Sequence, residues 1–156
     1  MEQNFFLKRT TTADQDFLFL VTRLDHELWN ELNADMKTYD PHNKVPDIKT
    51  ALVIYINEEP AACGCFKKFD EETAEIKRMF VQKNYRGLGL SKKILKELEH
   101  WAVENNYRQT ILETSIHFKT ARQLYETNGY KIISNYPPYV GLPESVCMKK
   151  ELLKTS

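Results

Sequence analysis

The residues with the clearest chemical potential lie in a glycine-punctuated segment, Val81 to Ser91, in which Gly87 and Gly89 stand two positions apart. Glycine allows tight backbone turns that expose main-chain N–H groups. A helix that begins here directs the positive end of its dipole towards the same point. The segment therefore predicts a cradle for a pyrophosphate, with a surface turn capped by Gly-x-Gly as the alternative interpretation.

The sequence on both sides of this segment supports the cradle. Glu75 to Val81 is predicted to be a strand that runs directly into the loop. After the loop, apolar residues recur with the spacing of one helix face, at Ile94, Leu95, Leu98, Trp101 and Ala102. A Walker loop and a dinucleotide fingerprint fit less well. The former needs Lys-Ser/Thr where Leu90-Ser91 stands, and the latter needs a third glycine.

A second segment, Ala121 to Tyr130, combines a helix face with a helix stop. Ala121, Leu124 and Tyr125 share one side of a helix, and Gly129 suits the left-handed position that ends it. Tyr130 then begins a strand. The segment therefore predicts a short amphipathic helix followed by a strand.

Together, the two segments resemble the GNAT superfamily of acetyl-CoA-dependent N-acetyltransferases. Arg86 to Ser91 is similar to its acetyl-CoA motif, Arg/Gln-x-x-Gly-x-Gly/Ala, with serine in the last, small position. Ala121 to Tyr130 is similar to the family segment Ala-x-x-Leu-Tyr-x-x-x-Gly-Phe/Tyr. The resemblance covers Glu75 to Tyr130. It implies the GNAT acyl-CoA N-acyltransferase fold, an α/β (α+β) domain whose mixed sheet has an antiparallel meander followed by a β-α-β crossover.

The resemblance also implies how acetyl-CoA is held. Main-chain N–H groups of the loop would bind the pyrophosphate. The preceding strand would bind the pantetheine arm like an added strand and polarise the thioester carbonyl through an N–H group. The residues implicated are Met79, Phe80 and Val81 in the strand and Arg86, Gly87, Leu88, Gly89, Leu90 and Ser91 in the loop. Lys92-Lys93 either contacts the 3′-phosphate or forms a solvated helix face.

Two catalytic side chains follow from the same resemblance. Tyr125 matches the tyrosine that family members often use as the general acid for the thiolate; the alternative is a core tyrosine with a satisfied hydroxyl. Glu75 lies near the strand start, where some members carry a base or water-positioning glutamate. The alternative is a solvated carboxylate paired with Lys77 or Arg78. The strand residues of like parity, which would share one face, are Glu75, Lys77, Met79 and Val81.

One position departs from the family pattern. Phe118 stands where an asparagine often contacts the cofactor, and its side chain removes that contact. His117 beside it is interpreted as a polar loop residue rather than a base. The remaining histidines are scattered and the sequence contains no Cys-x-x-Cys, so we predict no metal site.

Composition sets the class and the partners. A chain of 156 residues is long enough for one sizeable core, so we expect a single GNAT domain over residues 1–156. Lys plus Arg and Asp plus Glu both count 22, which predicts no nucleic-acid or membrane partner. The N-terminus has no signal-peptide pattern, and three cysteines make an odd number. Reduced thiols and a cytoplasmic location are therefore expected. Cys63 and Cys65, two apart in a strand, should face one side as small buried hydrophobes.

The other elements are predicted from periodicity and turn residues. A first strand over Asn4 to Arg9 precedes a helix capped by Thr12 or Asp14, whose inner stripe is Phe17, Leu20, Val21, Leu24 and Leu28. Asn30 to Thr50 is expected to be a loop or short helix. The meander strands are Ala51 to Ile56, Ala61 to Phe69 and Thr73 to Val81, with a hairpin turn at Asn57 to Pro60. The later elements are a helix over Ser91 to Asn105, a parallel strand over Gln109 to Thr114, and strands over Tyr130 to Ser134 and Val146 to Leu152.

The resemblance implies transfer of an acetyl group from acetyl-CoA to a primary amine of a small molecule or peptide, by direct attack on the polarised thioester. Two alternatives are a non-catalytic acyl-CoA-binding sensor and a nucleotide-binding domain. A homodimer is compatible with this reading. In this fold the acceptor site would involve acidic and aromatic residues suited to a cationic amine: Glu27, Glu31, Asp35, Tyr39, Asp40, Tyr136 and Tyr139.

Overall fold

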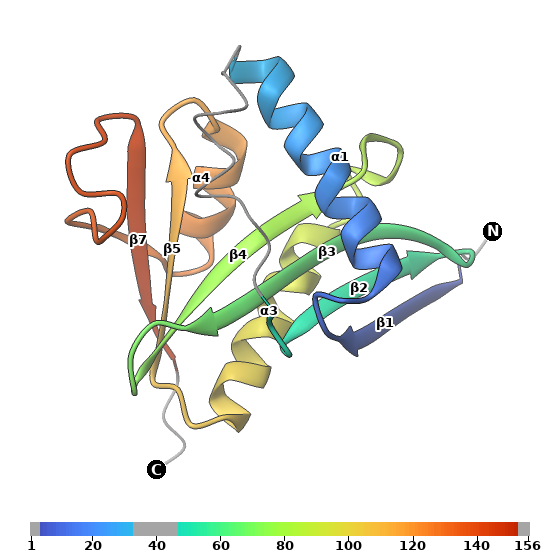
Figure 1. Cartoon of the computed structure of the whole chain (residues 1–156), viewed down its shortest axis with the longest axis horizontal. Helices are drawn as coiled ribbons and strands as arrows, with labels where there is room; N and C mark the ends of the chain where they lie inside the picture. The colour runs from blue at the N-terminus through green and yellow to red at the C-terminus, as the bar shows by residue number, and fades with distance from the viewer. Residues whose placement is uncertain (1–3, 33–46, 153–156) are drawn as a thin grey trace. The chain divides into compact units, whose positions relative to one another are not determined.

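The computed structural model describes residues 4–32 and 47–152. Its strands form a seven-stranded mixed sheet in the order β1-β2-β3-β4-β5-β7-β6. Figure 1 labels these strands apart from β6. The strands are β1 (Phe5–Thr10), β2 (Ala51–Ile56), β3 (Glu59–Lys68), β4 (Thr73–Val81), β5 (Gln109–Ser115), β6 (Lys131–Ile133) and β7 (Ser145–Glu151). The helices in the described residues are α1 (Gln15–Leu32), α3 (Leu90–Glu104) and α4 (Lys119–Thr127). The α/β class with a mixed sheet, predicted from the sequence, is confirmed.

The first strands form the predicted antiparallel meander. Strand β1 pairs with β2, and β2 pairs with β3. The β2–β3 hairpin turns on Asn57 and Glu58, whose φ angles are 49° and 70°. Two central residues with positive φ are typical of the type I′ turn, which matches the twist of the flanking strands. The turn is therefore tighter than predicted, because Glu59 and Pro60 already belong to β3.

The predicted β-α-β crossover is also present. After β4 the chain passes through α3 and returns as β5, which lies parallel to β4 with Thr73 opposite Gln109 and Glu75 opposite Ile111. Strand β7 then pairs antiparallel with β5, and β6 pairs with β7. Parallel neighbours need such a crossover because a tight turn cannot join them.

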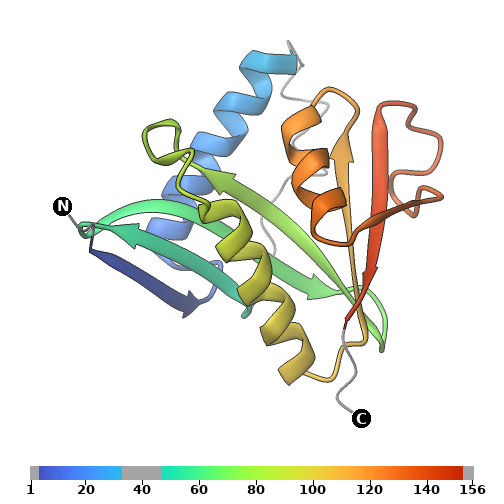
Figure 2. The ribbon, with the colours of Figure 1, turned by 180° about the vertical axis from the view of Figure 1, so that it is seen from behind.

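Contacts divide the chain into two compact units, and each is described by itself. The first contains Met1–Cys65 and Arg78–Leu95, and the second contains Phe66–Lys77 and Lys96–Ser156. The strands β3 and β4 and the helix α3 each contribute residues to both units. Figures 1 and 2 view the ribbon from opposite sides and show, within the first unit, α1 on one face of β1–β3 and the start of α3 on the other.

The first unit has an apolar core beneath α1. Cys63 and Cys65 both lie in it, at 0% and 1% exposure, as expected for small buried hydrophobes. Thr12 does not cap α1; it bonds the main chain of Ile48, whose N–H donates to the Thr12 hydroxyl at 2.8 Å. The buried members of the core are Phe17, Leu20, Val21, Ile48, Ala51, Val53, Cys63, Cys65 and Phe80.

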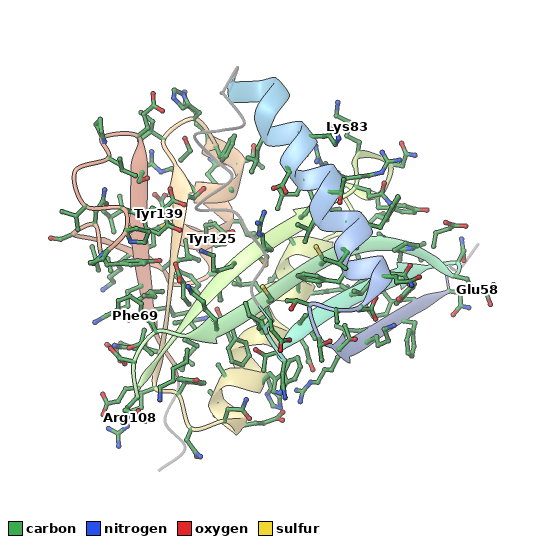
Figure 3. All side chains as sticks on the ribbon, viewed as in Figure 1. Glu58, Phe69, Lys83, Arg108, Tyr125 and Tyr139 are labelled. Carbon is green, nitrogen blue, oxygen red and sulfur yellow. The ribbon has the colours of Figure 1, made fainter. Side chains whose placement is uncertain are left out.

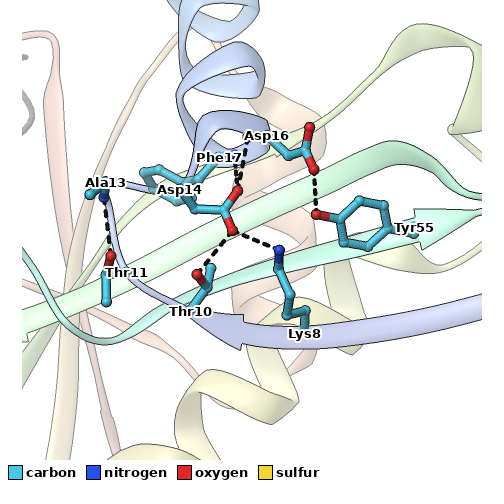
Figure 4. A network of polar contacts seen from close by, with 8 residues as sticks. All are labelled: Lys8, Thr10, Thr11, Ala13, Asp14, Asp16, Phe17 and Tyr55. Atoms are coloured by element: carbon cyan, nitrogen blue, oxygen red, sulfur yellow. Dashed lines mark hydrogen bonds and ion pairs between the residues drawn. The ribbon is translucent and has the colours of Figure 1, made fainter.

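The start of α1 is capped by Asp14 (Figure 4). Its Oδ1 accepts hydrogen bonds from the main-chain N–H groups of Asp16 at 2.8 Å and Phe17 at 3.2 Å. Its Oδ2 accepts from Lys8 Nζ at 2.7 Å and from the Thr10 hydroxyl at 3.0 Å. An aspartate in this position satisfies N–H groups that have no partner inside the helix. The cap thus ties α1 to β1.

The second unit contains a buried polar network. The Tyr130 hydroxyl donates to Glu99 Oε2 at 2.9 Å and accepts from the Thr110 hydroxyl at 2.7 Å. Lys150 Nζ reaches the other Glu99 oxygen at 2.8 Å. These contacts join α3, β5, β7 and the residue before β6. Strand β6 begins one residue later than predicted, at Lys131, and the buried Tyr130 side chain before it is held by Glu99.

Candidate active site

The glycine loop of the first unit offers unused main-chain donors. After a 3₁₀ turn at Lys83–Tyr85, Gly87 and Gly89 have φ angles of 85° and 77°, and α3 begins at Leu90. The first N–H to re-enter the helix pattern is that of Lys93, which donates to Gly89 O at 3.2 Å. From Gly87 through Lys92, no main-chain N–H donates to a described residue. A helix start with open N–H groups attracts anions.

The space around these glycines is also open. A Cβ atom added at Gly87 or Gly89 would meet nothing within 4 Å. Both positions nevertheless require a left-handed backbone that other residues adopt only with strain. The loop therefore combines a constrained backbone with an accessible outer side, which fits a bound pyrophosphate.

Arg86 connects this loop to α1 instead of pointing at an open space. Its NH2 contacts both carboxylate oxygens of Glu27, at 2.9 and 2.7 Å, and its Nε donates to Val81 O at 2.9 Å. Its main-chain N–H donates to Lys83 O at 3.3 Å. A contact between Arg86 and a pyrophosphate stays a prediction, and the open donors lie in the residues that follow it.

Strand β4 contains a break that was not expected from the sequence. Arg78 has a φ angle of 62°, in the left-handed region, although it is neither glycine nor asparagine. Such a residue interrupts the two-residue period of a strand. The predicted common face of Glu75, Lys77, Met79 and Val81 therefore does not hold across Arg78. The Arg78 side chain pairs with Asp25 of α1, NH1 to Oδ1 at 2.7 Å, and not with Glu75.

Tyr125 lies on α4 in the second unit and is labelled in Figure 3. It is 7% exposed and packs edge-on against Tyr130, with ring centroids 5.8 Å apart. Its hydroxyl makes no hydrogen bond to any described residue. Burial, with a smaller contribution from the charge of Glu113, raises the pKa of Tyr125 to about 12. The proton therefore stays on Tyr125 at neutral pH.

Glu75 is buried in the second unit, so the solvated alternative does not describe it. It is 3% exposed, and its Oε2 accepts a hydrogen bond from the Tyr136 hydroxyl at 2.8 Å. Lys67 Nζ lies 3.8 Å from Oε1 and Lys77 Nζ lies 4.0 Å from Oε2. Burial and the Glu75 charge raise the pKa of Tyr136 well above its usual value. This hydroxyl therefore remains a donor to Glu75.

A second carboxylate in this unit was missed at the level of sequence. Glu113 lies on β5, two residues beyond Ile111, and its Oε2 accepts from the Ser145 hydroxyl at 2.7 Å. Burial raises the pKa of Glu113, and the Glu75 charge adds to this, whereas the Ser145 hydrogen bond and Lys77 oppose it. The alternation of β5 offered a signal, because it places Ile111 and Glu113 on the same face.

Aromatic side chains lie beside these carboxylates. Tyr136 packs edge-on against Phe69 and Tyr139, with centroids 5.2 and 5.5 Å apart, and the last two are labelled in Figure 3. Lys77 Nζ donates to the Tyr139 hydroxyl at 3.3 Å. The predicted acceptor residues Tyr136 and Tyr139 therefore lie together. Three other predicted acceptor residues lie outside the described residues: Asp35, Tyr39 and Asp40. The side chain of Glu31, a fourth, is also outside the described part of the structure.

The remaining polar candidates have ordinary surroundings. His117 Nε2 lies 3.3 Å from a Glu144 oxygen, and Phe118 precedes α4 without a side-chain cap. Lys93 Nζ lies 5.1 Å from the centre of the Phe5 ring. In the described residues, no helix has the length and apolar character needed to cross a membrane.

Comparison with known proteins places the chain in a family. Residues 13–130 match the acetyltransferase (GNAT) family. The chain therefore belongs to the GNAT family, as its two motifs indicate.

Individual relatives agree with this placement. The uncharacterized N-acetyltransferase YsnE of Bacillus subtilis is 33% identical over 97 residues, covering 61% of this chain and 64% of that protein. The N-acetylaspartate synthetase of Danio rerio is 31% identical over 70 residues, covering 45% of this chain and 25% of that protein. The aligned segments thus span less than two thirds of either relative.

A solved structure extends the similarity over the whole fold. The crystal structure of a Klebsiella pneumoniae protein assigned as an acyl-CoA N-acyltransferase superposes with a TM-score of 0.79 at 29% identity. The superposition covers 96% of this chain and 98% of that one. The GNAT fold predicted from the sequence is confirmed.

Proposed function

We propose that the protein is an N-acetyltransferase that transfers an acetyl group from acetyl-CoA to a primary amine of a small molecule or peptide. The observation that carries the proposal is the run of open N–H groups from Gly87 through Lys92 at the start of α3. Family membership supplies the ligand, because GNAT motifs of this kind bind acetyl-CoA. Within the loop, Gly87 to Ser91 would hold the pyrophosphate, and Met79, Phe80 and Val81 would bind the pantetheine arm.

In the proposed reaction the amine nitrogen attacks the thioester carbonyl, an amide forms, and the carbon–sulfur bond breaks. An N–H group of Met79, Phe80 or Val81 would stabilise the developing oxyanion. The leaving thiolate must gain a proton, and the amine must lose one. Tyr125 and Glu75 are the side chains proposed for these two roles.

Tyr125 is the proposed proton donor for the thiolate. Its hydroxyl is the kind of donor required, since it keeps its proton and has no described partner. A thiol titrates near pH 8.5 and Tyr125 near 12, so full transfer is uphill by about three to four pKa units. Tyr125 therefore acts first as a hydrogen-bond donor to the developing thiolate, and the proton follows only as charge builds on sulfur.

Glu75 is the proposed base or water-positioning residue. Its buried carboxylate is held by Tyr136 and flanked by Lys67 and Lys77, so it would act on the amine through ordered water rather than by direct contact. If so, Glu75→Gln should lower kcat and leave acetyl-CoA affinity nearly unchanged. An unchanged kcat would assign the carboxylate a structural role.

The acceptor is proposed to be a small amine or a peptide N-terminus. The name of the Danio rerio relative describes an enzyme that makes N-acetylaspartate, which favours a small acceptor. A cytoplasmic location is proposed from the three cysteines, which are buried thiols. We also propose that the chain forms a single domain and that the protein is a homodimer. Analytical ultracentrifugation would measure the oligomeric state.

Two measurements test the proposal in sequence. Titration calorimetry with acetyl-CoA, ATP and NAD should show binding of acetyl-CoA alone. A thiol-release assay with a panel of amines should then show turnover. Binding of ATP or NAD in place of acetyl-CoA would contradict the proposal. Acetyl-CoA binding with no turnover of any amine would favour the alternative, a non-catalytic acyl-CoA sensor.

A further inference from the structure

Arg78 carries a buried donor that the proposed reaction does not use. Its side chain is 7% exposed, and NH1 bonds Asp25 Oδ1 at 2.7 Å. Its NH2 is buried and has no hydrogen-bond partner among the described residues. Most buried polar groups in folded proteins have a partner, and leaving one unpaired is costly. The cost is greater for a charged group.

The backbone at this residue is unusual as well. The φ angle of 62° places an arginine in the left-handed region in the middle of β4. The Arg78 carbonyl accepts from Cys63 Sγ at 3.4 Å, and Asp25 of α1 holds the guanidinium. Strained residues persist where their surroundings hold them, and they cluster at ligand sites. Two independent features therefore single out Arg78.

The charge balance around Arg78 limits what could bind. The Arg78–Asp25 pair is neutral overall, so the site does not present the excess positive charge that a phosphate dianion requires. A single carboxylate oxygen can still accept a hydrogen bond from NH2, because hydrogen bonds between a guanidinium and a carboxylate are charge-assisted and strong. The guanidinium would then donate through NH1 to Asp25 and through NH2 to a second carboxylate.

We infer that Arg78 binds a carboxylate of the acceptor, so that the acceptor class is an amine that carries a carboxylate, such as a free amino acid. The inference rests on the proposed acetyl transfer. Asp25 is the positioning residue, which holds the guanidinium through NH1 and leaves NH2 without a described partner. Arg78 is the specificity residue, since it would contact the acceptor but not the reacting bond.

Matched pairs of acceptors test the inference. Each free amino acid is compared with its carboxamide, which keeps the amine and side chain but loses the negative charge. With saturating acetyl-CoA, the wild-type protein should have a kcat/KM about tenfold or more higher for the acid than for the amide. Arg78→Lys should lower kcat/KM for the acid by about tenfold, mainly through KM, and leave the amide nearly unchanged.

Two further variants separate recognition from folding. Arg23→Lys changes an exposed arginine of α1 and should keep the wild-type preference for acids. Asp25→Asn keeps Arg78 but removes its charged partner, so it should reduce the preference without abolishing turnover of the amide. If Arg78→Lys does not fold, two other results test the inference: the wild-type ratio of kcat/KM for acid and amide, and the change in that ratio in Asp25→Asn.

Several results would overturn the inference. These are equal kcat/KM for acid and amide in the wild type, an unchanged ratio in folded Arg78→Lys, and turnover of peptides or uncharged amines with none of amino acids. Failure to bind acetyl-CoA would instead contradict the proposed function, and calorimetry detects it separately. Acetylation of other amines with no turnover of any carboxylate-bearing amine overturns the inference as well.

Discussion

Tyr125 and Tyr130 are both buried side chains, but their hydroxyl groups differ in what they contact. The rings pack against each other, but only the Tyr130 hydroxyl has described partners, Glu99 and Thr110. A hydroxyl that is paired serves the fold, whereas one without a described partner is available for a ligand. This difference makes the two residues a matched pair for experiment.

Tyr125→Phe should lower kcat by roughly ten- to thousandfold and leave acetyl-CoA affinity unchanged. The loss should lie at the lower end, because the raised pKa of Tyr125 limits proton transfer and thiolate is already a fair leaving group. Tyr130→Phe is the control: it should cost about 1–3 kcal/mol in the free energy of unfolding and keep kcat. If Tyr125→Phe melts earlier and keeps its specific activity, Tyr125 is only a core residue.

Glu113 should make stability depend on pH. Burial, opposed in part by Ser145 and Lys77, raises its pKa, so the folded state favours the protonated form. Its contribution to stability is fully present below the ordinary pKa of 4.5 and is lost as pH rises through the raised value. Glu113→Gln stays neutral. It should therefore be more stable than the wild type near pH 7 and equal to it near pH 4.

Urea unfolding at the two pH values measures this difference. Glu151→Gln, which changes an exposed carboxylate at the end of β7, should alter stability little at either pH. A difference between Glu113→Gln and the wild type that is the same at both pH values would contradict the raised pKa.

At the scale of elements, the start of α3 depends on two left-handed glycines. Gly87→Val or Gly89→Val should weaken acetyl-CoA binding by about tenfold or more, because a β-branched residue strains the backbone that presents the N–H groups. Gly141→Val is the control, since Gly141 also has a positive φ, 82°, with nothing within 4 Å of an added Cβ. It should lose similar stability and keep its affinity, as calorimetry can show. Equal affinities in all three variants would place the cradle elsewhere.

The start of α1 depends on the Asp14 cap. Asp14→Ala should lower the free energy of unfolding by about 1 kcal/mol, because the N–H groups of Asp16 and Phe17 lose their acceptor. Asp14→Asn keeps a capping oxygen and loses the charge paired with Lys8. The free energy of unfolding of Asp14→Asn, measured with denaturant, should lie between those of the alanine variant and the wild type. Equal losses in both variants would assign the effect to the ion pair alone.

At the scale of the whole molecule, the two compact units share three elements. Because β3, β4 and α3 each contribute residues to both units, neither unit can lose its part of an element without breaking hydrogen bonds in that element. We therefore expect one cooperative unfolding transition, as in a single domain. Scanning calorimetry should give equal calorimetric and van't Hoff enthalpies. Two resolved transitions would contradict the single domain predicted for residues 1–156.

The sequence by itself determined the meander, the crossover, the glycine loop and the position of Tyr125. Each depends on local rules: apolar periodicity, turn residues, and the freedom of Gly87 and Gly89 to adopt positive φ. The motifs around Gly87 and Tyr125 then indicated the family. The cap at Asp14 was also among the local predictions, because a helix start is set by a few neighbouring residues.

Only the tertiary structure decided which distant side chains meet. Arg78 and Asp25 are 53 positions apart, Glu75 and Tyr136 are 61 apart, and Glu113 and Ser145 are 32 apart. The left-handed Arg78 also had no local signal, since its conformation is maintained by contacts rather than by residue type. Such pairings depend on strand register and on the packing of α1. Both are set by residues far apart in the sequence, so the periodicity of one segment does not reveal them.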